Sequence, residues 1–238
     1  YDGVLIHSDP DIITLDETFS RLEDICIPLH YTGFVSQNRQ ETSRESIRGK
    51  LTLGPQDKLI IASIGGGSVG SELLFATIQA LNSMALSVQA HLQIFSGPYC
   101  SDTIYSQLQE KTRKNITLQR FTDHFPGWLQ AADLSISMAG YNTCMNLVQA
   151  GIPALVYPFD QNREQRLRAE RLGKKTGMSV LSDRDLPPAS FSRHIIRHLD
   201  TPRSTEFINI DGARGTATQL ETWFNQHSKP DKPDEPEN

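Results

Sequence analysis

The sequence has little cysteine, no long apolar run and no excess of positive charge, and each absence excludes a class of protein. Its three cysteines show no paired or metal-like spacing, which argues against a disulfide scaffold and for a reducing, cytoplasmic compartment. No apolar run approaches the ~20 residues of a membrane-spanning helix. The net charge of -5 provides no global basic field for nucleic acid. We therefore expect a globular, cytoplasmic protein without a nucleic-acid partner.

Short apolar runs alternate with segments of helical periodicity beyond Gly54 and Pro55. This alternation predicts an α/β fold, in which a parallel sheet carries helices on both faces. The predicted strands are 58–64, 88–95, 116–120, 134–138, 153–157 and 178–181. The predicted helices are 71–82, 103–112, 126–130, 142–150, an amphipathic helix ending near 172, 189–198 and 213–224.

The ends of the chain differ in character from this regular region. The first residues predict a strand over 2–7, a helix over 15–24 and an apolar run over 27–31, with a domain boundary near residue 35. Because the chain opens at Tyr1 with a strand almost at once, we expect a carboxyl-terminal fragment. Residues 228–238 are proline-rich and charged, which predicts disorder. The expected division is 1–35, 36–227 and 228–238.

A glycine loop follows the first strand of the regular region and precedes a helix. Residues 65–70 satisfy the pattern G-x-G-x-x-G of dinucleotide-binding folds. Such folds place an acidic residue at the end of the second strand, but here that strand ends in Phe95, Ser96 and Gly97, which counts against NAD. Two interpretations stay open: the glycines allow a phosphate or sugar to approach the backbone closely, or they serve only the packing of a turn.

Polar residues follow two later strands at the predicted ligand-binding edge of the sheet. Gly140, Asn142 and Thr143 lie where a helix begins, and free N–H groups there can hold a phosphate. The segment 160–165 follows the next strand and carries side chains that bind hydroxyl groups. Together they suggest a nucleotide-sugar, although helix capping and a solvated helix start would explain them separately. The six basic residues between Arg163 and Lys175 are interpreted as a solvated face.

The loop 120–126 follows the third predicted strand of the regular region. Its backbone could recognise a flat base, with Phe121 or Phe125 packing nearby. His124 suggests a general base. The alternative is that Asp123 caps the short helix and His124 is a half-buried surface residue.

The segment 138–172, MAGYNTCMNLVQAGIPALVYPFDQNREQRLRAERL, resembles the donor-binding signature of the MurG-like glycosyltransferases. These are the family 28 type with the GT-B fold, and the likeness is greatest to a predicted bacterial subgroup with a G-Y-N-T turn. The resemblance covers roughly residues 58–225. It is specific because the glycine loop, the loop at Phe121 and the long signature occur in the same order. It implies a Rossmann-like domain, the carboxyl-terminal half of a GT-B enzyme, with residues 1–35 as the end of the acceptor domain and the linker.

The resemblance also implies which residues bind the donor, a UDP-sugar that is a substrate rather than a cofactor. They are Gly66, Gly67 and Ser68 near the donor and its diphosphate, Thr122 and Asp123 at the uracil, Gly140, Asn142 and Thr143 at the diphosphate, and Asp160, Glu164 and Gln165 at the sugar hydroxyls.

Two departures from the family pattern stand out. The family usually places a glutamate in the signature helix to bind both ribose hydroxyls, whereas this chain has Asn146, which loses the charge-assisted pair. The amino-terminal acceptor domain is almost wholly absent, so no catalytic base is assigned. No metal site is expected. The implied partners are the nucleotide-sugar donor and the missing acceptor domain. A peripheral association with the inner face of the membrane is also implied.

By this resemblance the complete protein transfers a sugar from a UDP-sugar to an acceptor hydroxyl with inversion. The chain alone is expected to be inactive. Two alternatives remain: a non-catalytic donor-binding subunit that needs a partner chain, or a Rossmann-type NAD oxidoreductase or nucleotide-sugar epimerase. The sequence leaves open the sugar, the acceptor and the oligomeric state.

Overall fold

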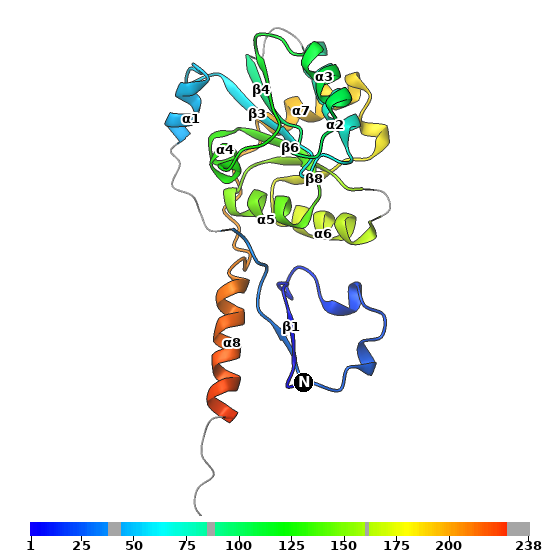
Figure 1. Cartoon of the computed structure of the whole chain (residues 1–238), viewed down its shortest axis with the longest axis vertical. Helices are drawn as coiled ribbons and strands as arrows, with labels where there is room; N and C mark the ends of the chain where they lie inside the picture. The colour runs from blue at the N-terminus through cyan, green and yellow to red at the C-terminus, as the bar shows by residue number, and fades with distance from the viewer. Residues whose placement is uncertain (38–43, 85–88, 160–161, 228–238) are drawn as a thin grey trace, which may run out of the picture. The chain divides into compact units, whose positions relative to one another are not determined.

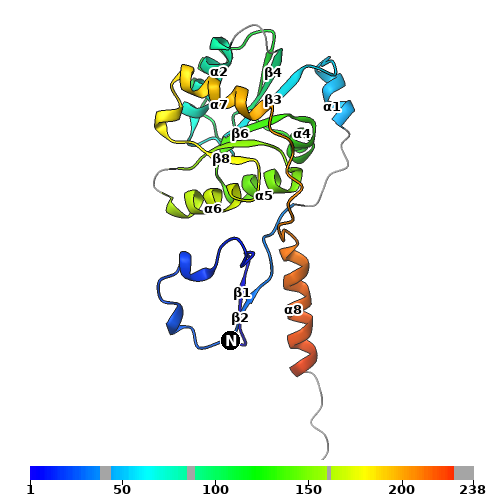
Figure 2. The same ribbon diagram turned by 180° about the vertical axis from the view of Figure 1, so that it is seen from behind.

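The computed structural model describes residues 1–37, 44–84, 89–159 and 162–227. Contacts between residues separate the chain into two compact units. Unit 1 combines Tyr1–Ser36 with the chain from Asn209 onward, and unit 2 runs from Gln37 to Ile208. Figure 1 shows the sheet and helices of unit 2, and Figure 2 shows them from behind.

Unit 2 contains a six-stranded parallel sheet, as the sequence predicts. Its strands are β3 (Lys58–Ser63), β4 (Ala90–Phe95), β5 (Ile116–Gln119), β6 (Leu134–Met138), β7 (Ala154–Tyr157) and β8 (Met178–Val180). Each differs from its predicted range by at most two residues, and residue 88, predicted to open the second strand, lies outside the described part of the chain. The order β5-β4-β3-β6-β7-β8 reverses between β3 and β6, as in doubly wound folds.

Helices cover both faces of this sheet (Figures 1 and 2). On one face lie α2 (Ser71–Ser83), α3 (Asp102–Glu110) and α7 (Pro188–Leu199), which pack on alternate strand residues such as Ile60, Leu92 and Ile136. On the other lie α4 (Phe125–Ala131), α5 (Tyr141–Ala150) and α6 (Arg163–Gly173). A short 3-10 turn (η3, Asp183–Asp185) precedes α7. Burial of both faces explains the nearly continuous apolar runs of β3 and β7, whereas β4 and β6 alternate apolar residues with the buried polar residues Gln93, Ser135 and Ser137.

Asp133 joins α1 (Arg44–Lys50) to the sheet of unit 2. Its carboxylate accepts hydrogen bonds from the Leu59 N–H at 2.7 Å, Arg44 Nη2 at 2.7 Å and Arg48 Nη1 at 3.1 Å. Burial alone would raise the pKa of Asp133, but these donors outweigh it and hold the pKa below its ordinary value. The carboxylate therefore stays ionised inside the fold and fixes α1 beside β3.

Arg203 ties the end of unit 2 to two helix carboxyl termini. Its guanidinium donates to the backbone oxygens of Gln130 in the last turn of α4 and of Ala132 just after it, at 2.8 and 2.6 Å, and to that of Ala150 in α5 at 2.7 Å. These are helix-end carbonyls that have no partner within their own helix. A cation at this position also matches the negative end of each helix dipole.

Unit 1 contains the parallel pair β1 (Val4–Ile6) and β2 (Leu29–Tyr31) and the helix α8 (Gly212–His227). Trp223 of α8 packs edge-on against His30, with ring centres 5.3 Å apart. The predicted helix over 15–24 is wrong: two 3-10 turns, Leu15–Glu17 and Leu22–Asp24, take its place. Thr18 Oγ1 bonds the Leu15 carbonyl, and no residue from 15 to 24 is fully buried, so little apolar packing rewards a continuous helix.

Helix α8 lies in unit 1, although its sequence was predicted to belong to the same domain as the sheet. The first boundary, between Ser36 and Gln37, falls within two residues of the predicted one. Compact units are not functional domains, so the donor-binding assignment of residues 36–227 stays a prediction. The predicted disordered segment, 228–238, lies outside the described residues. No helix in the described ranges combines the length and the apolar character needed to cross a membrane.

Candidate functional site

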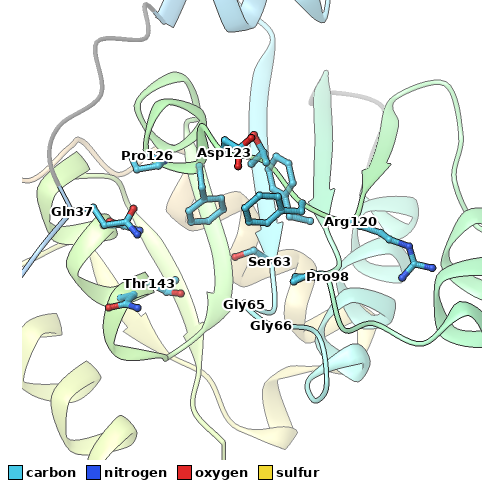
Figure 3. Close-up of a pocket in the computed structure, with 15 residues that line it drawn as sticks. Gln37, Ser63, Gly65, Gly66, Pro98, Arg120, Asp123, Pro126 and Thr143 are labelled. Atoms are coloured by element: carbon cyan, nitrogen blue, oxygen red, sulfur yellow. The ribbon is translucent and has the colours of Figure 1, made fainter.

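A cavity of about 420 Å³ opens where the parallel strands of unit 2 end. Loops after β3, β4 and β5 and the first turns of α5 line it, which places it at the point where the strand order reverses. Open α/β sheets bind ligands in the crevice at such a switch point. Figure 3 shows Gln37 and Thr143 at the left of the view and Pro126 and Asp123 above. Ser63, Gly65 and Gly66 lie near the middle of the view, and Pro98 lies to the right.

The glycine loop packs backbone against backbone on the turn after β4. Gly67 and Gly97 both have left-handed backbones, with φ of 93° and 87°. A Cβ atom on Gly67 would overlap the Ser96 carbonyl oxygen, and one on Gly97 would overlap the backbone of the glycine loop. The Tyr99 N–H donates to the Gly66 carbonyl at 2.8 Å. Packing therefore requires Gly67, whereas Gly66 lines the cavity.

An aromatic cluster supports the wall formed by the loop after β5. Phe95, the last residue of β4, packs edge-on against Phe125 at 5.8 Å and Trp128 at 5.5 Å between ring centres. Phe95 and Phe125 line the cavity, together with Phe121, which is 62% exposed. Such a wall offers a rigid apolar surface to a flat ring.

Arg120 closes the rim beside this wall. Its Nη1 donates to the Cys100 carbonyl at 2.6 Å, its Nη2 pairs with Asp102 at 2.5 Å, and its guanidinium carbon lies 4.3 Å from the centre of the Tyr105 ring. The guanidinium is turned away from the cavity (Figure 3). It therefore fixes the loops that build the rim, and its aliphatic stem provides the lining surface.

Helix α5 begins at the cavity without a side-chain cap. Its N-cap residue is Gly140, which has no side chain, and Asn142 and Thr143 of the first turn line the cavity. The N–H groups at a helix start have no partner within the helix, and the helix dipole adds a partial positive charge there. The first turn of α5 can therefore hold an anionic group. Asn142 and Thr143 are not the N-cap, contrary to the capping interpretation.

Asn146 lies one turn further along α5 and is 6% exposed. It lines the cavity, and its side-chain oxygen Oδ1 has no hydrogen-bond partner among the described residues. A buried amide oxygen without a partner costs free energy of about 1–3 kcal/mol. A ligand that donates a hydrogen bond into the cavity would remove this cost.

The structure brings together part of the predicted donor-binding set. Gly66, Thr122, Asp123, Asn142, Thr143 and Asn146 all line the one cavity. Five others do not line it: Gly67, Ser68, Gly140, Glu164 and Gln165. Asp160 lies outside the described residues.

Side chains of α6 form local contacts instead of lining the cavity. Gln165 Oε1 accepts a hydrogen bond from the Phe159 N–H at 3.1 Å, and Asn162 Oδ1 caps the helix by accepting from the Gln165 N–H at 3.1 Å. These bonds tie Phe159 and Asn162 to the first turn of α6. The predicted solvated face of α6 is wrong at Arg168, which is 8% exposed because it packs toward α5.

His124 is exposed, does not line the cavity, and forms the N-cap position of α4. Asp123 is therefore not the cap of that helix. Within the described ranges, no group of three or more histidine, cysteine, aspartate and glutamate residues is placed to hold a metal ion.

Several lining residues were not predicted from the sequence, among them Gln37, Ser63, Phe95 and Pro98. Ser63 and Phe95 are the last residues of β3 and β4, so their positions at the carboxyl ends of neighbouring parallel strands were the available signal. Gln37 lies far away in sequence, and its carbonyl is held by Gln149 Nε2 at 3.0 Å. No local pattern around Gln37 indicates that contact.

Comparison with curated proteins finds relatives among bacterial transferases. The chain is 25% identical over 150 residues to the UDP-N-acetylglucosamine--N-acetylmuramyl-(pentapeptide) pyrophosphoryl-undecaprenol N-acetylglucosamine transferase of Frankia casuarinae, with 63% of this chain and 39% of the relative covered. It is 26% identical over 200 residues to the enzyme of the same name from Rickettsia akari, with 80% of this chain and 50% of the relative covered. The chain therefore spans only about two fifths to one half of these relatives.

Solved structures share the fold at low sequence identity. MurG of Acinetobacter baumannii superposes with a TM-score of 0.60 at 17% identity, covering 94% of this chain and 67% of that one. CalG4, a calicheamicin glycosyltransferase, superposes with a TM-score of 0.65 at 15% identity, covering 96% and 53%. These likenesses show the GT-B type of fold.

A family match covers more than half of the chain. Residues 61–217 match the family described as Glycosyltransferase family 28 C-terminal domain. This range contains the sheet of unit 2, apart from the first strand residues, and all cavity-lining residues except Gln37. With its doubly wound sheet and the cavity at the switch point, the chain belongs to the glycosyltransferase family 28 C-terminal domain family.

Proposed function

We propose that this chain is the donor-binding half of an inverting glycosyltransferase that takes a UDP-sugar. The observation that carries the proposal is Asn146, a cavity-lining residue between an aromatic wall and a helix start, whose buried side-chain oxygen has no hydrogen-bond partner among the described residues. Those three features suit the hydroxyls, the base and the diphosphate of one nucleotide. The names of the relatives, which specify UDP-N-acetylglucosamine, support uridine as the nucleoside.

Each part of the nucleotide has a matching part of the cavity. The base would lie against the loop at Phe121, with the backbone near Thr122 and Asp123 reading its edge. The diphosphate would lie at the first turn of α5, beside Asn142 and Thr143. The ribose would then lie between them, and its hydroxyls would donate hydrogen bonds to Asn146 Oδ1.

The chemistry of transfer follows from this arrangement. When the bond from the sugar carbon to the diphosphate breaks, negative charge develops on the leaving oxygen. Backbone donors and the dipole of α5 are already aimed at that position, so they stabilise the charge without reorganising. The acceptor hydroxyl and the base that deprotonates it would come from the amino-terminal half of the complete protein, the partner that the family organisation implies. A peripheral membrane contact of that complete protein is part of the same proposal.

Calorimetric titration with UDP tests the proposal, with GDP and NAD as competing nucleotides. We expect saturable binding of UDP, and Asn146→Ala should weaken it about fivefold to tenfold, because one hydrogen bond of about 1–1.5 kcal/mol is lost. Asn82→Ala is the matched control, since Asn82 is exposed near the carboxyl end of α2. Its affinity for UDP should equal that of the unmodified chain.

Two results would contradict the proposal. One is the absence of UDP binding, and the other is binding of NAD at least as tight as that of UDP. If UDP binds but Asn146→Ala does not weaken it, the ribose position is wrong while the donor assignment stands.

A further inference from the structure

Arg168 is a buried cation beside the first turn of α5. Its side chain is only 9% exposed, although it lies on the basic helix α6. Its guanidinium carbon lies 5.1 Å from the centre of the Tyr141 ring, and Tyr141 is the first residue of α5. In both views α6 follows α5 along the same face of the sheet (Figures 1 and 2). The side chain of Arg168 thus reaches from one helix to the start of the other.

The surroundings described for Arg168 neutralise its charge poorly. The carboxylate of Glu164 lies 3.8 Å from Nη1, and the Glu164 side chain is 65% exposed, so water screens the pair. Arg168 Nε has no hydrogen-bond partner in the described part of the chain. Tyr141 contributes the face of its ring, which attracts a cation without neutralising it.

Cys144 is the other neighbour of Arg168 on α5, and it too is uncharged. Its side chain is fully buried. Burial raises the pKa of the Cys144 thiol to about 11, while the nearby Arg168 guanidinium acts in the opposite direction. At neutral pH the thiol therefore keeps its proton and supplies no negative charge.

The positive end of the α5 dipole lies beside the positively charged Arg168 side chain. The N-terminal end of a helix carries about half a positive charge, and Gly140 contributes no capping oxygen there. A buried cation beside that end is unfavourable unless an anion compensates both. Asn142 and Thr143 line the cavity on the same turn, and so does Asn146, whose buried side-chain oxygen has no partner among the described residues. The arrangement is therefore poised for an anionic ligand in the cavity.

We infer that Arg168 is a positioning residue for the diphosphate group of a nucleoside diphosphate. It holds the first turn of α5 through Tyr141 and increases the positive potential at the anion site, without touching the ligand. This inference rests on the proposed function and adds to it a residue that lies behind the binding surface.

Calorimetric titration with UDP, inorganic pyrophosphate and uridine tests the inference on four proteins. Arg168→Met should weaken the binding of UDP and pyrophosphate about tenfold, or about 1.4 kcal/mol, and leave uridine binding unchanged. Arg168→Lys keeps the charge and should stay within about threefold of the unmodified chain. Arg166 lies on the same helix, but its side chain is 40% exposed. Arg166→Met should therefore change the affinity for each ligand by no more than about twofold. Circular dichroism checks the fold, and Arg168→Gln replaces Arg168→Met if the latter does not fold.

The three ligands separate this inference from the proposed function. If UDP binds equally well to the unmodified chain and Arg168→Met, the inference is overturned and the donor assignment stands. It is also overturned if Arg168→Lys loses as much affinity as Arg168→Met, or if uridine binding weakens by the same factor. If pyrophosphate binds in an Arg168-dependent manner but UDP does not bind, the anion site is supported and the uridine assignment fails. If the unmodified chain binds neither UDP nor pyrophosphate, both the inference and the proposed function are overturned.

Discussion

Substitution of Gly67 by alanine is expected to lower the free energy of unfolding by about 3 kcal/mol or more. Gly67 has φ of 93°, a conformation that costs an L-residue roughly 1–2 kcal/mol. The added Cβ would also overlap the Ser96 carbonyl oxygen and lie 2.8 Å from the Cys100 nitrogen. Both are backbone atoms, so relief requires the two loops to separate, and such overpacking typically costs about 1–3 kcal/mol. Urea denaturation followed by circular dichroism measures the change.

Gly66→Ala is the matched control for this prediction. It adds the same methyl group one residue earlier in the same loop, where the nearest atom is Tyr99 Cδ2 at 3.5 Å, an ordinary contact distance. Its φ is not positive, so the backbone tolerates a side chain. We expect Gly66→Ala to change stability by less than about 1 kcal/mol. Equal losses for the two variants would show that the interlocked loops are not the cause.

Substitution of Asp133 by asparagine is expected to cost about 3 kcal/mol of stability. The change removes the charge that compensates Arg44 and Arg48, whose guanidinium groups remain at the same place. Breaking a buried ion pair by removing one partner typically costs about 3–5 kcal/mol, because the other charge is left uncompensated. Asp102→Asn is the control: Asp102 also pairs with an arginine, but its side chain is 98% exposed. Thermal unfolding should show a clear loss for the first variant only, and a similar midpoint for both would contradict the prediction.

Stability should also depend on pH through Asp133. Because its folded-state pKa lies below the unfolded value of about 4, its contribution is complete above that value and is lost as pH falls through the folded-state pKa. The unmodified chain should therefore lose more stability than Asp133→Asn between about pH 4 and pH 2. Parallel stability curves for the two proteins over this range would refute the assignment.

The order of the elements in unit 2 was predictable because each is defined locally. Apolar runs such as 153–157 are too short for helices and are bounded by turns, and the intervening segments have helical periodicity. Right-handed crossover between parallel strands then leaves few topologies, and the observed doubly wound order is one of them. The prediction of a helix over 15–24 was wrong because local periodicity is not sufficient without burial. The helical periodicity of that segment is real, but little of the segment is buried in the fold.

The candidate site was only partly predictable. Thr122, Asp123, Asn142 and Thr143 follow strand ends, and this position alone brings them to one edge of a parallel sheet. Gln165 follows a strand end as well, yet its side chain bonds the Phe159 N–H instead. Whether a polar side chain near a strand end faces the cavity or its own loop depends on local backbone geometry, which residue type does not reveal.

The sequence by itself determined the α/β architecture, the family resemblance and the edge of the sheet at which a ligand would bind. Only the tertiary structure decided that Gly67 interlocks with the turn at Gly97, that the buried Asn146 oxygen finds no partner among the described residues, and that Arg168 is buried beside α5. The physical reason is the range of the interactions. Periodicity and turn chemistry act between near neighbours in the chain, whereas burial and charge compensation depend on residues that only folding brings together.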